Sequence, residues 1–290
     1  MSGKGESLFA IIPFRALGYQ SDGGFRGPSS HGLGRGPVSI ILSMVNWIES
    51  LGRFLAFAGR ALVAALLAWR RPSEVWRQLY LMLLGSLPLG FIAGVALGAV
   101  AWWHLNGVVD SAFAAKVPEY LALAVALEFA PLGAGMVVAG RCGAALGAEL
   151  SSMRLTEQVD ALEAMGLSAM RYLVGPRTMA AMIALPLLTI YLAVFALGSS
   201  YLAEMAAGSM YDTQYINALE RGLGRANLVA ALLKTIVFGA LIAIAGCWHG
   251  LHAPPGAEGV GIAATRGVVL AIQLVLASNV VLVKLIQIAG

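Results

Sequence analysis

The sequence predicts an all-α membrane protein, and three observations lead to that prediction. Hydrophobic residues make up 59% of the 290 residues and charged residues only 12%, whereas a soluble domain carries about 25% charged residues. The mean hydropathy is +0.80. Apolar runs of about 20 residues, each long enough to cross the hydrocarbon as a helix, recur along the chain.

Residues 1–36 differ from the rest of the chain. They are rich in Gly, Ser and Pro and carry scattered arginines. Their one apolar run, residues 8–14, is broken by Pro13 and is too short for a secretory signal. We therefore predict a disordered cytoplasmic extension, with a targeting peptide as the less favoured alternative. Residues 37–290 are expected to form a single membrane domain.

Residues 38–70 are predicted to form a helix that lies in the membrane interface. Asn46, Glu49, Arg53 and Arg60 recur at helical spacing and share one face. Apolar side chains cover much of the opposite face, a pattern typical of an interfacial amphipathic helix. The alternative is an ordinary first span that tolerates a few charges.

Five further runs are predicted to span the membrane as helices. They cover residues 79–103, 120–139, 179–203, 228–248 and 267–288. Trp102 and Trp103 end the first run, as aromatic residues do at a membrane interface.

The distribution of Lys and Arg predicts the orientation. Segments 53–77 and 141–177 hold nine arginines, whereas segments 104–118 and 204–227 hold only Lys116, Arg221 and Arg225. Positive loops remain in the cytoplasm. We therefore expect a cytoplasmic N-terminus, a cytoplasmic 141–177 segment and a C-terminus on the outer side.

A charged segment follows the second span. Residues 149–166 are expected to form one amphipathic helix that ends at Gly166. Ser168 would cap the next helix, and Gly175-Pro176 would end it, which gives a helical hairpin between two spans. The hairpin is either a solvated connection or a docking surface, and the candidate surface residues are Glu149, Met153, Arg154, Glu157, Asp160 and Glu163. Arg154 and Glu157 are three residues apart and are expected to pair.

The second span contains two further features, a series of small residues and a carboxylate. Ala139, Gly143 and Gly147 recur every four residues and let helices approach closely, either within one subunit or at a dimer interface. Glu128 lies deep in the span, where a carboxylate is costly unless it is paired or faces water. It either forms a structural hydrogen bond, aided by the backbone freed at Pro131, or lines a polar cavity.

The sequence lacks the motifs that are typical of several activities. There is no G-x-x-x-x-G-K-[ST] loop, so we expect the chain not to bind ATP. Cys142 and Cys247 form no C-x-x-C motif, and the four histidines form no metal-ligand pattern. No basic module with interleaved aromatic residues indicates nucleic-acid binding. We predict a non-enzyme with no metal and no cofactor of its own.

The residues from about 40 to 289 resemble the MlaE/YrbE family, the permease subunits of ABC-type lipid transporters that work with MCE-domain proteins. The resemblance lies in these blocks: Glu128-Phe129-Ala130-Pro131, Ala139-Gly140-Arg141-Cys142-Gly143, Ala148-Glu149-Leu150, Met153-Arg154-Leu155-Thr156-Glu157-Gln158, Ala164-Met165-Gly166, Pro176-Arg177, Leu185-Pro186-Leu187-Leu188, Lys234-Thr235-Ile236-Val237-Phe238 and Ala264-Thr265-Arg266.

The resemblance implies a homodimer in a bacterial inner membrane, bound by a separate ATPase subunit and an MCE-domain protein, with phospholipid as the expected cargo. It implies that the 149–166 segment is a coupling helix that docks on the ATPase. It also makes Glu128, Pro131 and Arg266 candidates for the lipid cavity, while Arg266 has a cytoplasmic anchor as its alternative role. The family commonly has Arg where this chain has Leu127 and Ile262, which weakens any transfer of a headgroup site.

Two other function classes remain as alternatives. One is a membrane scaffold or assembly factor that moves nothing. The other is a secondary transporter, which would show matching halves and several midplane ionisable residues. The sequence shows no convincing internal repeat and only Glu128 deep in a span, so we rank this alternative last.

Overall fold

The computed structural model describes residues 37–108, 116–208 and 211–289, so the predicted extension over residues 1–36 lies outside the described residues. Every regular element in the described residues is a helix, which confirms the all-α prediction. The chain divides into two parts, residues 1–57 and 58–290, which are described separately.

The predicted helix over 38–70 is confirmed as α1 (Pro37–Ala68). Glu49 and Arg53 share a face of this helix, and their exposed side chains lie 3.9 Å apart. Residues Ile48–Ala68 are also long and apolar enough to cross a membrane, and the interfacial location of α1 stays a prediction. In the second part of the chain, Ala61, Ala64 and Ala65 of α1 are buried.

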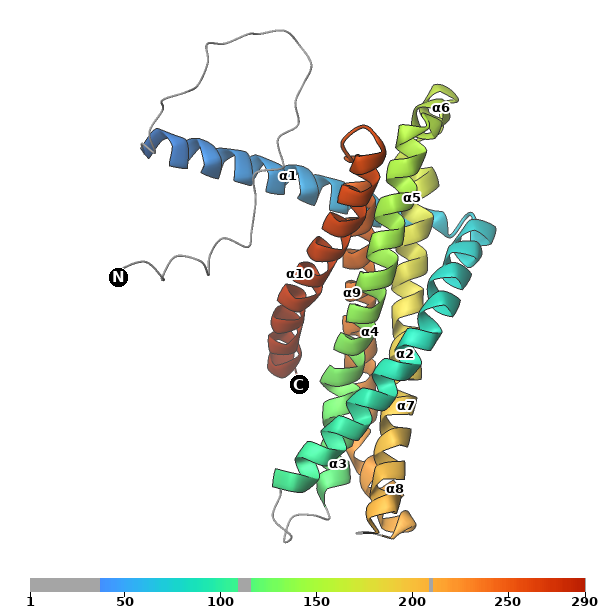
Figure 1. Ribbon diagram of the computed structural model, residues 1–290, viewed down its shortest axis with the longest axis vertical. Helices are drawn as coiled ribbons and strands as arrows, with labels where there is room; N and C mark the ends of the chain where they lie inside the picture. Colours follow the sequence, from blue (N-terminus) through green and yellow to red (C-terminus); the bar gives the residue numbers. More distant parts are fainter. Residues whose placement is uncertain (1–36, 109–115, 209–210, 290) are drawn as a thin grey trace, which may run out of the picture. The chain divides into compact units, whose positions relative to one another are not determined.

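Five long helical runs form the body of residues 58–290 and contain the five predicted spans (Figure 1). The first run is α2 (Pro72–Val108). The second comprises α3 (Val117–Ala124), the π-helical turn η3 (Val125–Phe129), α4 (Ala130–Val138), the π-helical turn η4 (Ala139–Gly143) and α5 (Ala144–Leu155). The third comprises the π-helical turn η5 (Met170–Val174) and α7 (Gly175–Ala207), and the last two are α9 (Arg225–Leu251) and α10 (Ala257–Ala289).

The third run corrects one prediction. Gly175-Pro176 was expected to end a helix, but the chain continues through it from η5 into α7. Pro176 lies in the first turn of α7, directly after the π-helical turn η5. The hairpin therefore has no separate second helix, and its return arm is the beginning of the third span.

α2 and α7 pack closely because α2 carries three glycines spaced four residues apart, Gly90, Gly94 and Gly98. A Cβ on Gly94 would lie 2.9 Å from the Leu192 carbonyl oxygen of α7, and a Cβ on Gly98 would overlap the Ala196 carbonyl. Phe91 of α2 also meets Phe195 edge to face, with ring centroids 4.7 Å apart. Glycines in this arrangement let two backbones approach within membrane helices, and we did not predict this ridge.

The ridge that we did predict lies against helices of the same chain. A Cβ on Gly147 would lie 2.7 Å from the Ala263 carbonyl of α10, and one on Gly143 would lie 3.4 Å from Val268 Cα. Ala139 is fully buried. These contacts match the first of the two interpretations, packing within one subunit.

A short helix that we did not predict, α8 (Asp212–Gly222), lies at the end of the bundle opposite α6 (Gln158–Ala164) (Figure 1). Tyr215 is fully buried on its inner face and donates a hydrogen bond of 3.0 Å to Ser200 Oγ of α7. Burial raises the pKa of this phenol. At the same end, Trp102 Nε1 donates to the buried carboxylate of Glu204 over 2.7 Å, so hydrogen bonds join the ends of α2, α7 and α8.

Candidate functional site

One cluster of polar side chains lies inside the bundle. Glu128 of η3 accepts hydrogen bonds from Lys234 Nζ of α9 at 3.1 Å and from Asn279 Nδ2 of α10 at 3.2 Å. We call these three residues the intramembrane cluster, since each belongs to a helix long and apolar enough to span a membrane. The Lys234 side chain is 1% exposed and that of Glu128 is 36% exposed.

Lys234 has a second acceptor, and its position follows from Pro131. In an α-helix the Leu127 carbonyl would accept from the N–H of residue 131, which proline lacks. Lys234 Nζ donates to that carbonyl over 2.7 Å. Pro131 is buried one turn from Glu128, so the proline and the carboxylate contribute to one site.

The cluster combines the two interpretations that we left open for Glu128. Its carboxylate does make structural hydrogen bonds to neighbouring helices, yet more than a third of the side chain stays exposed. Our expectation that only Glu128 lies deep in a span is wrong, because Lys234 is buried in α9. A charged residue within a predicted span is itself a signal of function, and that signal was present at Lys234.

The third cavity candidate is not part of this cluster. Arg266 and Asn279 both lie in α10 but 13 residues apart, which is roughly 20 Å along a helix. Arg266 is half-buried and lines a shallow hollow near the start of α10 with Ala257, Glu258, Gly261, Ile262 and Thr265. The structure therefore brings Glu128 and Pro131 together and leaves Arg266 at a distance.

The charged segment, residues 149–166, is not one continuous helix as expected. α5 ends at Leu155, and α6 begins at Gln158. Between them Glu157 adopts a left-handed conformation with φ 58°, which ends the α-helical path for a non-glycine residue. Gly166 ends the segment as predicted, with φ 77° and its N–H bonded to the Glu163 carbonyl at 2.9 Å.

The side chains of this segment form a surface of mixed character. Arg154, Glu157, Asp160 and Glu163 are exposed and Met153 is half-buried. Two large apolar side chains are also exposed, Leu155 at 45% and Met165 at 66%. In the part of the chain that the structure describes, Arg154 and Glu157 form no ion pair, since the break at Glu157 disrupts the helical spacing.

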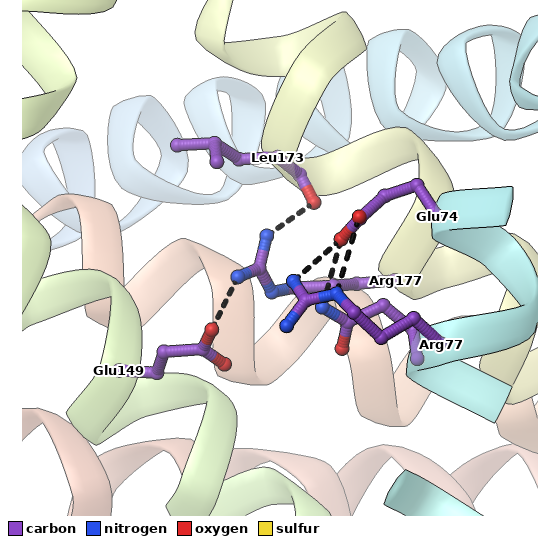
Figure 2. Close-up of polar contacts among 6 residues, drawn as sticks. Glu74, Arg77, Glu149, Leu173 and Arg177 are labelled. Carbon is purple, nitrogen blue, oxygen red and sulfur yellow. Dashed lines mark hydrogen bonds and ion pairs between the residues drawn. The ribbon is translucent and has the colours of Figure 1, made fainter. Parts of the chain in front are cut away.

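A second polar cluster lies at the base of the charged segment (Figure 2). Arg177 of α7 donates from Nη2 to Glu149 Oε1 of α5 at 2.6 Å and from Nη1 to the Leu173 carbonyl at 2.9 Å. Beside it, Arg77 of α2 donates to Glu74 at 2.7 Å. We call this set, completed by Gln78, the base cluster. Glu149, a candidate for the docking surface, has a side chain that is 45% exposed, and its carboxylate is bonded to Arg177 of the same chain.

The two arginines of the base cluster differ in burial. Arg177 is 3% exposed, whereas Arg77 is 57% exposed and, within the described residues, bonds to Glu74 of its own helix. Sequence analysis gave Arg177 no role beyond positive charge in the cytoplasm. The available signal was an arginine at the start of an apolar run.

Comparisons with known proteins match most of the chain. A model of the family described as Permease MlaE matches residues 75–285. A probable ABC transporter permease protein of Rickettsia typhi is 32% identical over 83% of this chain and 94% of its own length. A probable ABC transporter permease protein of Synechocystis is 38% identical over 55% of this chain and 60% of its own length. The chloroplastic protein Trigalactosyldiacylglycerol 1 of Arabidopsis thaliana is 36% identical over 56% of this chain and 46% of its own.

Proposed function

Because this chain belongs to the MlaE permease family and is a multi-pass membrane subunit of an ABC transporter, we propose that it moves lipids. The Arabidopsis relative is named after a galactolipid, which supports a lipid as the cargo. We propose phospholipid for this chain, in a bacterial inner membrane, together with an MCE-domain protein. An ABC permease implies an ATPase partner, and we propose that ATP binds there and that this chain carries no cofactor.

The exposed charged segment over residues 149–166 is the observation that carries the proposal. It continues one membrane helix, α5, and leads directly into the run that contains α7. Its exposed surface offers both charge signs and two apolar side chains. A partner can shift the permease only through contacts that differ between the partner's nucleotide states, and this surface is suited to provide them.

In the proposed mechanism two copies of the chain enclose a cavity between their spans. Apolar walls hold the acyl chains, and the exposed edge of the Glu128 carboxylate meets the headgroup. The MCE-domain protein docks at the end that carries α8. ATP-driven movement of the charged segment closes the cavity and lowers its affinity for the lipid.

The test is the double variant Arg154→Ala/Glu157→Ala. Both side chains are exposed and neither bonds within the described residues, so their loss should weaken ATPase binding without unfolding the chain. We expect reduced co-purification of the ATPase and reduced lipid-stimulated ATP turnover.

The matched control is Glu220→Ala/Arg221→Ala, which removes the same two charges from the exposed face of α8 at the other end. The control should keep the ATPase bound. Unchanged ATPase binding and turnover in the first variant would refute the docking role. If the wild-type chain binds the ATPase normally but lipid does not change the rate of ATP turnover, the result would favour the alternative of a membrane scaffold that moves nothing.

A further inference from the structure

We propose that Arg177 is a positioning residue that joins α5 to α7 through Glu149, so that a movement of the charged segment reaches α7. The inference rests on the proposed function, because it concerns how ATPase movement is transferred. It assigns to Glu149 a role inside the chain in place of partner contact.

The Glu149–Arg177 pair links the two attachments of the charged segment. The charged segment is attached to the bundle by α5 on one side and by η5 and α7 on the other. α5 packs mainly against α9 and α10, whereas α7 packs mainly against α2, α4 and α9. The bond between Glu149 and Arg177 links these two attachments directly, across 28 residues of sequence.

The helix α6 has a joint at each end. Glu157 breaks the helix on the α5 side, and Gly166 turns the chain on the α7 side. A push on α6 alone could be absorbed by bending at these two positions. The bond between Glu149 and Arg177 lies on the bundle side of both joints. It therefore makes the ends of α5 and α7 move together, and the movement of α6 is passed on to the membrane spans.

The Arg177 guanidinium is held in place by two acceptors. It is almost completely buried, and the Leu173 carbonyl of the same run holds Nη1 while Glu149 holds Nη2. Its Nε is buried without a partner in the described residues. A buried charge that loses its partner is strongly disfavoured, so Arg177 keeps Glu149 within reach.

The neighbouring pair of the base cluster provides a matched comparison (Figure 2). Glu74 and Arg77 have the same chemistry and lie in the same region, but they bond within one turn of α2, and Arg77 is 57% exposed. Their bond links no two helices. Loss of this pair should leave the transfer of movement unchanged.

The experiment uses the full chain in complex with its ATPase. The measured quantity is ATP turnover in vesicles of phosphatidylethanolamine and phosphatidylglycerol, divided by turnover in detergent. The main variant is Glu149→Gln/Arg177→Gln, which removes both charges and so leaves no unpaired buried charge. We expect this ratio to fall by about fivefold or more, the range of ordinary allosteric coupling.

The control Glu74→Gln/Arg77→Gln should keep the ratio within about twofold of the wild-type ratio, a change smaller than a typical allosteric effect. Arg177→Lys keeps the charge but lacks the fork that bonds two acceptors, and it should give an intermediate ratio. Two results would overturn the proposal. One is an unchanged ratio in the main variant. The other is failure of that variant to assemble, which would make the pair a folding requirement.

A second measurement needs no ATPase. Trypsin cleavage after the exposed Arg154 and Arg171 reports local opening of the charged segment in the isolated chain. Cleavage should be faster in the main variant and unchanged in the control, and equal rates would contradict the proposal. If the wild-type chain binds no ATPase, the proposed function fails, while the cleavage rates still decide whether the pair holds the segment.

Discussion

Glu128 and Lys234 form an ion pair whose two members differ greatly in exposure. The ammonium of Lys234 is buried with two acceptors, whereas the carboxylate of Glu128 keeps an exposed edge. Burying a charge lowers stability unless the charge is paired, so removing one partner of a buried pair destabilises the protein. The cost should therefore depend on which member of the pair is removed.

This asymmetry gives a prediction for stability. Glu128→Ala leaves the buried ammonium with only a carbonyl and should destabilise the chain by about 3 to 5 kcal/mol. Lys234→Met leaves a partly exposed carboxylate and should cost less. Thermal unfolding of both variants in detergent provides the measurement, and an equal loss from the two substitutions would contradict the asymmetry.

At the residue scale the sequence predicted the unusual side chains better than their partners. Glu128 and Pro131 stood out because a carboxylate and a proline are uncommon within an apolar run. Their link to Lys234 joins residues 106 positions apart, and the bond between Glu149 and Arg177 spans 28 positions. Such pairings depend on how helices pack, which periodicity within one helix does not contain.

At the scale of elements, charged side chains gather at the three π-helical turns. Glu128 lies in η3, Arg141 lies in η4, and Arg171 lies in η5, with Arg177 three residues after η5. The Arg141 guanidinium donates to the Leu81 carbonyl of α2 at 3.2 Å and to Ser86 Oγ at 3.3 Å. π-helical turns within α-helices are frequent at functional sites, which agrees with the residues found here.

The contact between α2 and α7 gives a prediction at this scale. Gly94→Ala would place a Cβ 2.9 Å from the Leu192 carbonyl, so the two backbones must move apart. Overpacking of this kind costs typically about 1 to 3 kcal/mol. Gly107→Ala in the same helix is the control, since a Cβ at that position would have no packing neighbour within 4 Å. Thermal unfolding should separate the two variants, and equal midpoints would refute the packing argument.

The helical spacing of polar and apolar residues was sufficient to predict α1, and apolar length and composition were sufficient to predict the five spans. They were not sufficient for the path of the chain between spans. The expected single helix over 149–166 is broken at Glu157, whose left-handed conformation has no signature in a non-glycine residue. α8 escaped prediction because its buried face consists of few residues, Tyr215, Ala218 and Gly222.

For the whole molecule, the orientation in the membrane is a prediction that labelling can check. The positive-inside rule places the charged segment in the cytoplasm and α8 on the outer side. Ala161 in α6 and Gln214 in α8 are both exposed. A membrane-impermeant thiol reagent should label Gln214→Cys in intact cells and Ala161→Cys only after permeabilisation.

The two native cysteines, Cys142 and Cys247, are buried and should contribute little to the signal. The wild-type chain is the control for that background. The opposite labelling pattern would place the charged segment outside the cell, where no ATPase subunit could reach it, and the proposed function would then fail.

The closely packed glycines of α2 restrict where the proposed phospholipid cargo could leave the protein sideways. Two backbones in contact offer no width for a pair of acyl chains, so the α2–α7 side should stay shut throughout the cycle. α10 is the least enclosed of the long helices, and it also carries Asn279, the partner of the exposed Glu128 carboxylate. A lateral exit would therefore open most readily beside α10, with the headgroup still in contact with Glu128 as the tails enter the bilayer.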